Sequence, residues 1–209
     1  MIPVTIKAVH YITNASSALC ESLGVAANHR CLALLTTDCD DATYIALDEA
    51  TKAADVDVSY GRSLYGGANN ASTPYAGEVI GILSAKTPGA VKSGMEAALS
   101  TLKRIGFNEC CQVPYLAHTI SSCGSFLAKE AGVPLGTALA YLIAPPLESM
   151  VGVDAALKAA NVTLCKLYAP PSETNFGGGL LCGIQSDCNA ACAAFAEAVE
   201  TIARNPLTP

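Results

Sequence analysis

Four acidic residues form the clearest candidate ligand site in this sequence. Asp38, Asp40 and Asp41 follow one apolar segment, and Glu78 begins another. Grouped carboxylates accept hydrogen bonds from a small cation. The alternative is structural: Asp40 is the N-cap of a helix and Asp41 lies in its first turn, where they satisfy backbone N–H groups and the helix dipole. Local sequence alone favours this capping role.

Catalysis and metal binding have less support. The sequence has three histidines: His10 and His118 lie on apolar segments, and His29 lies in a polar turn. It has no Gly-x-Ser-x-Gly, His-Glu-x-x-His or phosphate-loop pattern. Its ten cysteines include an adjacent pair at 110 and 111 and an i, i+4 pair at 188 and 192, and neither pair has the spacing of a zinc site. We therefore expect no enzyme, no metal site and, without a signal peptide, reduced thiols.

Two glycine-rich segments are the other candidate functional feature. They span residues 61–75 and 172–179. Loops of this length are uncommon in compact domains and are often functional. The alternative is a pair of plain surface loops.

Hydrophobic periodicity predicts the elements that position these residues. Strands and helices are mixed throughout, which predicts an α/β fold with an open sheet and flanking helices in each half. Expected strands cover 4–13, 31–37, 56–60, 78–83, 115–119, 139–144, 162–168 and 179–185. Expected helices cover 14–23, 40–54, 87–104, 123–131, 153–160 and 187–203.

An internal repeat organises these elements. Residues 50–58 return as residues 156–164, so that Lys52 is equivalent to Lys158. His10 and His118 are equivalent in the same way, which favours a structural role for both. We therefore predict two fused copies of one unit, with domains at residues 1–107 and 108–209.

Composition limits the classes of function. The chain has 209 residues, of which 51% are hydrophobic and only 14% charged, and its net charge is −6. Nucleic-acid binding is unexpected at this charge, and no apolar run approaches the ~18 residues of a membrane span. The low charge content favours oligomerisation, the alternative being a large two-domain core.

Several longer motifs carry a family resemblance. The chain resembles the tandem-domain shell proteins of bacterial microcompartments, and among them the ethanolamine-utilisation type. Residues 107–113, the short segment before Val4 and the additional cysteines depart from the family pattern. The motifs are at 40–46, 48–52, 60–65, 76–79, 87–98, 141–148, 156–162, 170–175 and 202–206.

The resemblance implies two tandem, circularly permuted shell domains that form a homotrimeric, pseudo-hexagonal tile. Such a tile would assemble with other shell proteins in a microcompartment shell within the cytoplasm. A central pore would be gated by the long loops, and the tile edges would be basic. The implied loop residues are Tyr65, Gly66, Gly67, Phe176 and Gly177, and the implied edge residues are Lys52, Lys158, Arg104 and Arg204.

The resemblance also implies a smaller pore that binds or passes ethanolamine. Asp40, Asp41 and Glu78 would face its ammonium and hydroxyl groups, and Phe107 would add a cation–π contact. No cofactor is implied, although a cobalamin is a candidate passenger or ligand of the pore. Two alternatives remain open: a soluble sensor of small cations, and a tandem shell protein of another compartment, such as the propanediol type.

Overall fold

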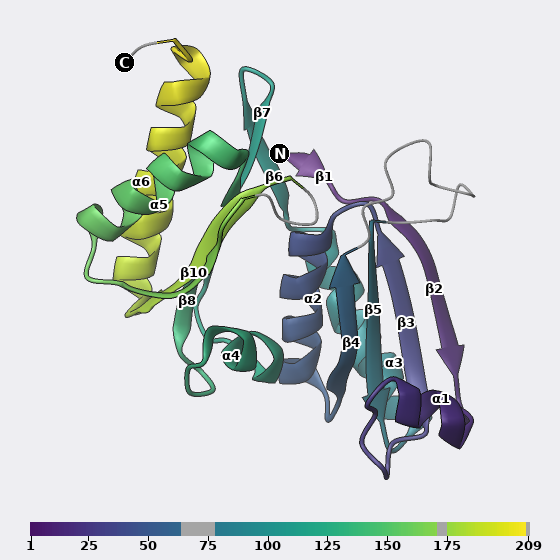
Figure 1. The fold of residues 1–209 in the computed structure, drawn as a ribbon. Helices are drawn as coiled ribbons and strands as arrows, with labels where there is room; N and C mark the ends of the chain where they lie inside the picture. Colours follow the sequence, from purple (N-terminus) through teal and green to yellow (C-terminus); the bar gives the residue numbers. More distant parts are fainter. Residues whose placement is uncertain (64–77, 171–174, 208–209) are drawn as a thin grey trace. The chain divides into compact units, whose positions relative to one another are not determined.

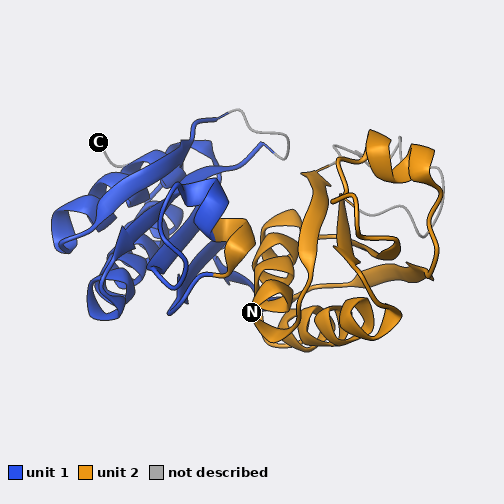
Figure 2. Cartoon of the chain, turned by 90° about the horizontal axis from the view of Figure 1, so that it is seen from below, with its two compact units in different colours: residues 1–2, 106–123, 128–209 blue, residues 3–105, 124–127 orange. Residues whose placement is uncertain are grey.

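The structure is a computed structural model that describes residues 1–63, 78–170 and 175–207. The chain divides into two compact units (Figure 2). One unit comprises residues 3–105 with 124–127, and the other comprises residues 1–2, 106–123 and 128–209. The predicted boundary between residues 107 and 108 stays a prediction.

The unit of residues 3–105 is built on a four-stranded antiparallel sheet of order β2-β3-β5-β4 (Figure 1). Helices α2 and α3 pack together on one face of this sheet. The segment around α1 packs on the opposite face, against Leu32 and Ile82. The strands are β2 (Ile6–Ile12), β3 (Cys31–Thr37), β4 (Asp57–Ser63) and β5 (Val79–Ala85), and the helices are α1 (Ser17–Ser22), α2 (Asp40–Ala53) and α3 (Pro88–Leu102).

The second unit repeats this plan with two additional strands. Its sheet has the order β1-β6-β7-β8-β10-β9, and α5 and α6 pack against its core. The strands are β1 (Ile2–Pro3), β6 (Gly106–Cys110), β7 (Val113–Ile120), β8 (Ala138–Ala144), β9 (Thr163–Tyr168) and β10 (Gly177–Gly183). The helices are α4 (Ser125–Ala131), whose first residues belong to the other unit, α5 (Pro146–Ala159) and α6 (Gln185–Arg204).

The two sheets share one topology. The order β2-β3-β5-β4 corresponds strand by strand to β7-β8-β10-β9, and the helix pair α2 and α3 corresponds to α5 and α6. This correspondence confirms the predicted α/β repeat, with an open sheet and flanking helices in each copy.

Local signals set several element ends as predicted. Thr87 is the N-cap of α3: its side chain accepts a hydrogen bond from the Ala90 N–H at 3.2 Å, and Pro88 occupies the first turn. Ser16 caps α1 in the same way through the Leu19 N–H. These caps fix where the chain leaves a strand and enters a helix.

Other element ends differ from the prediction. Strand β4 continues through Gly61 to Ser63, within the segment predicted to be a loop. Strand β10 begins at Gly177, which we expected in a loop. Gly177 is buried, and a Cβ there would lie 2.6 Å from the Ser149 Oγ. This close contact with α5 explains why the strand begins with glycine.

Candidate functional site

The predicted acidic residues gather at one end of the β3–β5 strand pair. Asp38 directly follows β3, and Glu78 directly precedes β5. The two strands are antiparallel, with Thr37 paired to Val79, and the Glu78 N–H donates to the Thr37 carbonyl at 2.7 Å. Strand pairing therefore brings together carboxylates that lie about forty residues apart in the chain.

Helix α2 begins inside this cluster, and its start corrects one prediction. The N-cap is Cys39, whose side chain makes no capping hydrogen bond, so Asp40 is the first helical residue rather than the N-cap. The Asp40 Oδ1 accepts from the Asp41 N–H at 2.9 Å. Both carboxylates thus lie in the first turn, where the helix dipole favours negative charge.

A short hydrogen-bonded chain orients Asp40. The Ser63 hydroxyl donates to the Asp40 Oδ2 at 2.6 Å, and the Tyr44 hydroxyl lies 2.7 Å from the Ser63 Oγ. Tyr44 is on α2 and Ser63 is the last residue of β4. Each Asp40 oxygen keeps further acceptor capacity, because a carboxylate oxygen has two lone pairs.

Burial differs among the carboxylates. Asp40 and Asp41 are buried, with 9% and 7% of their surface exposed, whereas Glu78 is exposed. Partial burial raises the pKa of Glu78, and the nearby charges of Asp40 and Asp38 raise it further, while Lys7 opposes them. The cluster is therefore a region of concentrated negative charge that favours a cation.

The Cys39 thiol within this cluster is a poor nucleophile. Burial raises its pKa far above the ordinary value, and the charges of Asp41, Asp40 and Asp38 add to the shift. The thiolate is the reactive form of cysteine. The acidic cluster therefore offers carboxylates for binding and no activated thiol for chemistry.

Phe107 belongs to the other compact unit. It lies on β6 and packs edge-to-face against Phe176, with ring centroids 5.7 Å apart. The resemblance assigned Phe107 to the small pore and Phe176 to the central pore, whereas in the structure the two rings are in contact. Gly177 follows Phe176 and is held in β10. Tyr65, Gly66 and Gly67 lie outside the described residues.

The predicted edge lysines occupy equivalent places in the two units. Lys52 and Lys158 lie in the last turns of α2 and α5, and each pairs with an acidic residue on the same helix. Lys52 pairs with Glu49, and the Lys158 Nζ lies 2.6 Å from the Asp154 Oδ2. Both lysine residues are exposed to solvent.

The two arginines lie at the ends of the corresponding second helices. Arg104 follows α3 and donates to the Ser100 Oγ at 3.4 Å. Arg204 ends α6 and pairs with the Glu200 Oε2 at 2.6 Å. Both arginines are exposed, so their guanidinium groups are accessible on the isolated chain.

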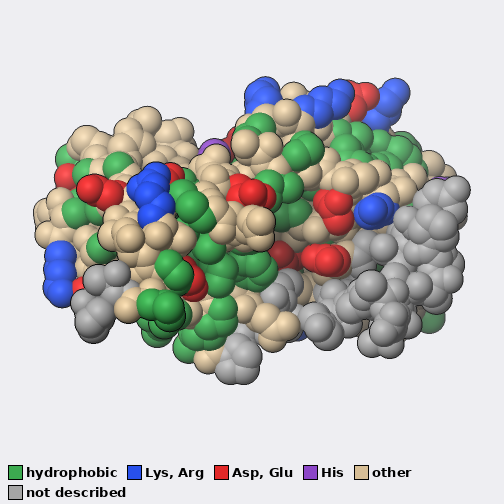
Figure 3. Space-filling view, turned by 90° about the horizontal axis from the view of Figure 1, so that it is seen from above, with side chains coloured by type: hydrophobic (Ala, Val, Ile, Leu, Met, Phe, Trp, Pro, Cys, Tyr) green, Lys and Arg blue, Asp and Glu red, His purple; other side chains and the backbone are tan. Residues whose placement is uncertain are grey.

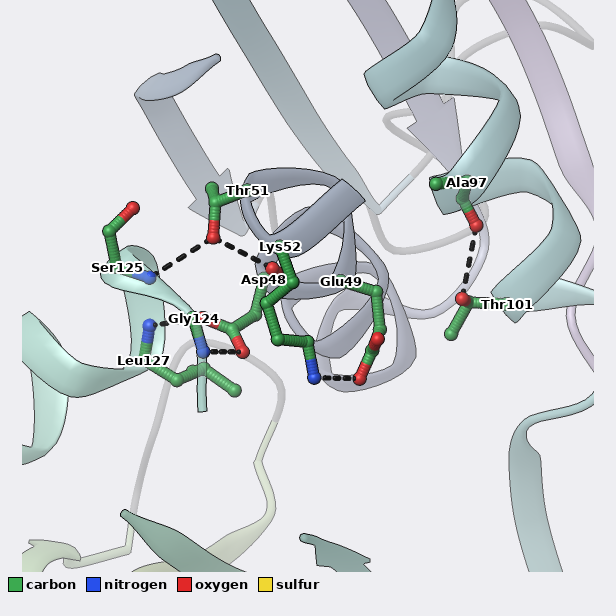
Figure 4. A network of polar contacts seen from close by, with 9 residues as sticks. All are labelled: Asp48, Glu49, Thr51, Lys52, Ala97, Thr101, Gly124, Ser125 and Leu127. Carbon is green, nitrogen blue, oxygen red and sulfur yellow. Dashed lines mark hydrogen bonds and ion pairs between the residues drawn. The ribbon is translucent and has the colours of Figure 1, made fainter. Parts of the chain in front are cut away.

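One buried acidic residue escaped the sequence prediction. The Asp48 carboxylate, on α2, accepts from the Gly124 N–H at 2.7 Å and the Leu127 N–H at 2.8 Å (Figure 4). The Thr51 hydroxyl bridges the Asp48 carbonyl and the Ser125 N–H. These groups tie residues 124–127 to α2, and no local signal in the sequence announces a contact across more than seventy residues.

The described residues show neither a cluster of three metal ligands nor a membrane-spanning helix. Within 1–63, 78–170 and 175–207, no three His, Cys, Asp or Glu side chains are grouped to hold a metal ion. In the same ranges, every helix is too short or too polar to cross a bilayer.

Comparison with known proteins decides the family. The BMC domain family matches residues 31–112. The bacterial microcompartment shell protein EutL of Clostridium perfringens is 54% identical over 99% of this chain and 97% of its own length. The chain belongs to the EutL family of bacterial microcompartment shell proteins. The crystal structure of the ethanolamine utilization protein EutL from Leptotrichia buccalis matches with a TM-score of 0.96 and 56% identity, covering 100% of this chain and 98% of that one.

Membership of the EutL family settles the coarse function. The chain has a structural role in a microcompartment shell, and its relatives are shell proteins rather than enzymes. The trimeric shell protein PduB shares the fold at a TM-score of 0.81 but only 18% identity, covering 96% of this chain and 89% of that one. The much higher identity to EutL proteins favours the ethanolamine-utilisation type over other tandem shell proteins.

Proposed function

We propose that three copies of this EutL-family chain form a pseudo-hexagonal shell tile with two domains from each copy. The duplicated sheet topology supports this arrangement, because two similar units per chain supply six similar positions in a threefold ring. The related shell protein PduB is described as trimeric. Among the described residues drawn in Figure 3, charged side chains form scattered groups between hydrophobic and other atoms, in keeping with the low charge content of the sequence.

The acidic cluster at the start of α2 would bind ethanolamine in a small pore. The observation that carries this proposal is that Asp40 and Asp38 lie close enough to exposed Glu78 to raise its pKa, with buried Asp41 beside Asp40 in the first turn of α2. Ethanolamine is a cation at neutral pH, with an ammonium that donates three hydrogen bonds and a hydroxyl that donates one. The protein EutL of Leptotrichia buccalis is described as an ethanolamine utilization protein.

Ethanolamine binding would also control a larger pore at the threefold axis. The proposed gate comprises Tyr65, Gly66 and Gly67, which lie outside the described residues, together with Phe176, which directly precedes the buried Gly177 at the start of β10. Ser63, which donates to Asp40, directly precedes residue 64 in the chain. The ligand shifts the gate only if it binds the closed and open states with different affinity. A cobalamin is a candidate passenger of this pore.

Calorimetric titration of the full chain with ethanolamine tests the small-pore site. A site with few contacts and partly exposed charge predicts a Kd in the micromolar to millimolar range. Asp40→Asn and Glu78→Gln each remove one charged acceptor and are expected to weaken binding by about tenfold. The matched control Glu109→Gln removes an exposed carboxylate from β6 and leaves the Kd unchanged.

Two outcomes would overturn the site. The first is no binding to the wild-type chain at about 10 mM ethanolamine, the weak limit of such a site. The second is equal weakening by Glu109→Gln and Glu78→Gln, which would indicate a long-range charge effect. Choline serves as a second ligand: its quaternary ammonium has no N–H donors, so it is expected to bind more weakly than ethanolamine.

Native mass spectrometry with electron microscopy of the same sample tests the tile. A trimer that forms flat hexagonal sheets would support it. A discrete monomer or dimer without sheets would contradict the tile, and ethanolamine binding to such a species would instead favour the sensor of small cations.

A further inference from the structure

Two adjacent cysteines lie where strand β6 enters the tight turn of the β6–β7 hairpin. Cys110 ends β6 and pairs with Val113 at the start of β7, so Cys111 and Gln112 make a two-residue turn. The backbone φ angles of these two turn residues are +50° and +67°. The turn of this hairpin lies within residues 107–113, the segment that departs from the family resemblance seen in the sequence.

The turn conformation is costly for the residues that occupy it. Hairpin turns with positive φ at both central positions strongly prefer Asn-Gly, because glycine has no Cβ. Cys111 and Gln112 both carry a Cβ. Residues held in such conformations often mark functional sites, because the surrounding structure has to enforce the strain.

The geometry of the two thiols matches one shared ion. The Cys110 and Cys111 Sγ atoms are 3.9 Å apart, and Cys111 is exposed while Cys110 is half-buried. Two bonds of about 2.3 Å from thiolates to a tetrahedral Zn²⁺ hold the sulfurs roughly 3.8 Å apart. The free thiols therefore already have the spacing of a chelating pair.

A basic group lies beside this pair. The Arg204 guanidinium, at the end of α6, lowers the pKa of Cys110, whereas burial, the hydrogen bond to Cys111 and the Glu200 charge raise it more strongly. Glu200 is itself held by Arg204 and by the Tyr115 hydroxyl at 2.5 Å. Arg204 favours the negative charge that develops when the thiols lose their protons to a bound cation.

We propose that Cys110 and Cys111 chelate one soft d¹⁰ cation of the Zn²⁺ and Cd²⁺ class at the tip of the β6–β7 hairpin. Two metal–sulfur bonds form, two S–H bonds break, and two protons pass to solvent, with no change of oxidation state. No third His, Cys, Asp or Glu joins the pair within the described residues. Two coordination positions therefore stay open to water or to a donor from outside the chain.

Titration of the reduced full-length chain with Cd²⁺ tests this site through the ultraviolet charge-transfer band of cadmium–thiolate bonds. One Cd²⁺ per chain is expected in the wild type. Cys111→Ser leaves a single thiolate and is expected to weaken the affinity roughly a hundredfold, because the second bond is no longer intramolecular. Cys165→Ser on β9 breaks the other hydrogen-bonded thiol pair, Cys165 with Cys182, and is the matched control that keeps wild-type affinity.

X-ray absorption of the wild-type Cd²⁺ complex gives an answer that needs no variant. Two sulfur neighbours and further oxygen neighbours are expected around the ion. Three or four sulfur neighbours, no charge-transfer band in the wild type, or loss of the band in Cys165→Ser but not in Cys111→Ser would each overturn the proposal.

Discussion

Glu78 carries its charge next to Asp38 and Asp40, and this placement makes a prediction about stability. Burial and like charges raise its pKa in the folded chain. A carboxyl group with a raised folded pKa costs stability that builds up as the pH rises above the unfolded pKa and is complete above the folded one, because the unfolded chain ionises more easily. Glu78→Gln is therefore expected to raise Tm by about 1–2 °C at pH 7.

The same comparison at low pH provides the control. Near pH 4 the carboxyl is largely protonated in the folded chain, so the gain from Glu78→Gln is expected to shrink toward zero. Glu109→Gln, on the exposed surface of β6, is expected to change Tm little at either pH. Scanning calorimetry at both pH values measures these shifts, and a lower Tm for Glu78→Gln at pH 7 would contradict the argument.

Sequence analysis found the acidic cluster because its residue types and strand ends are local features. It placed His29 in a turn, which the structure has, with the His29 N–H donating to the Ala26 carbonyl, but it did not predict that this side chain is buried, because its partners are distant. The structure buries His29, with its Nδ1 3.0 Å from the Ser84 Oγ and 3.5 Å from the Asp57 Oδ2. A polar segment predicts exposure unless the strands that cover it are already known.

At the scale of elements, the close packing of Gly124 against α2 allows a stability test of the contacts that Asp48 makes with residues 124–127. A Cβ at Gly124 would lie 2.3 Å from the Thr51 Oγ1 and 2.6 Å from the Asp48 carbonyl oxygen. The Thr51 Oγ1 accepts from the Ser125 N–H and donates to the Asp48 carbonyl oxygen, so the contact cannot relax without breaking a hydrogen bond. Gly124→Ala is expected to destabilise the fold by about 2 kcal/mol.

Gly89 in the first turn of α3 is the matched control for that substitution. A Cβ at Gly89 meets no atom within 4 Å. Gly89→Ala is therefore expected to be neutral or to stabilise the chain by about 0.5 kcal/mol, through the lower entropy of the unfolded state. Urea unfolding measures the free energy of unfolding of both variants. Equal changes in the two variants would contradict the predicted cost of a Cβ at Gly124.

Elements with local start signals were predictable, and elements defined by tertiary pairing were not. Strand β3 covers residues 31–37 as expected, because a continuous, mostly apolar run of seven residues favours a buried strand. Helix α5 begins at Pro146 rather than at 153: the Pro145-Pro146 pair suggests a break, whereas proline is well tolerated in a first helical turn. Strand β6, largely exposed and weakly apolar, exists through pairing with β7.

At the scale of the whole molecule, duplication is the feature that sequence revealed best. The repeat of residues 50–58 at 156–164 covers the ends of α2 and α5 and the strands that follow them. What the repeat did not show is the exchange of short segments, with residues 124–127 in one unit and residues 1–2 in the other. Gly106 permits the second exchange, since a Cβ there would lie 2.1 Å from the Ile2 carbonyl oxygen.

The repeat also predicts how tiles would join. Lys52 and Lys158 occupy equivalent last turns, so a threefold tile would present the same basic group at each of its similar edges. The Lys158–Asp154 pair lies within one helix and on its surface, whereas the Lys52 side chain is only 26% exposed and its charge also favours the ionised Asp48. An exposed pair such as that of Lys158 contributes only about 0–1 kcal/mol, so little would be lost if Lys158 turned to a neighbouring tile.

Replacing both lysines distinguishes contacts between neighbouring tiles from contacts between the three chains of one tile. Lys52→Ala with Lys158→Ala is expected to keep the trimer, and to change Tm by no more than about 2 °C, while flat sheets disappear from electron micrographs. Lys103→Ala, on an exposed residue just after α3, is the control and is expected to form sheets as the wild type does. If sheets persist without both lysines, these residues do not make the contacts between tiles. If the trimer is lost, they instead contribute to the contacts between chains within one tile.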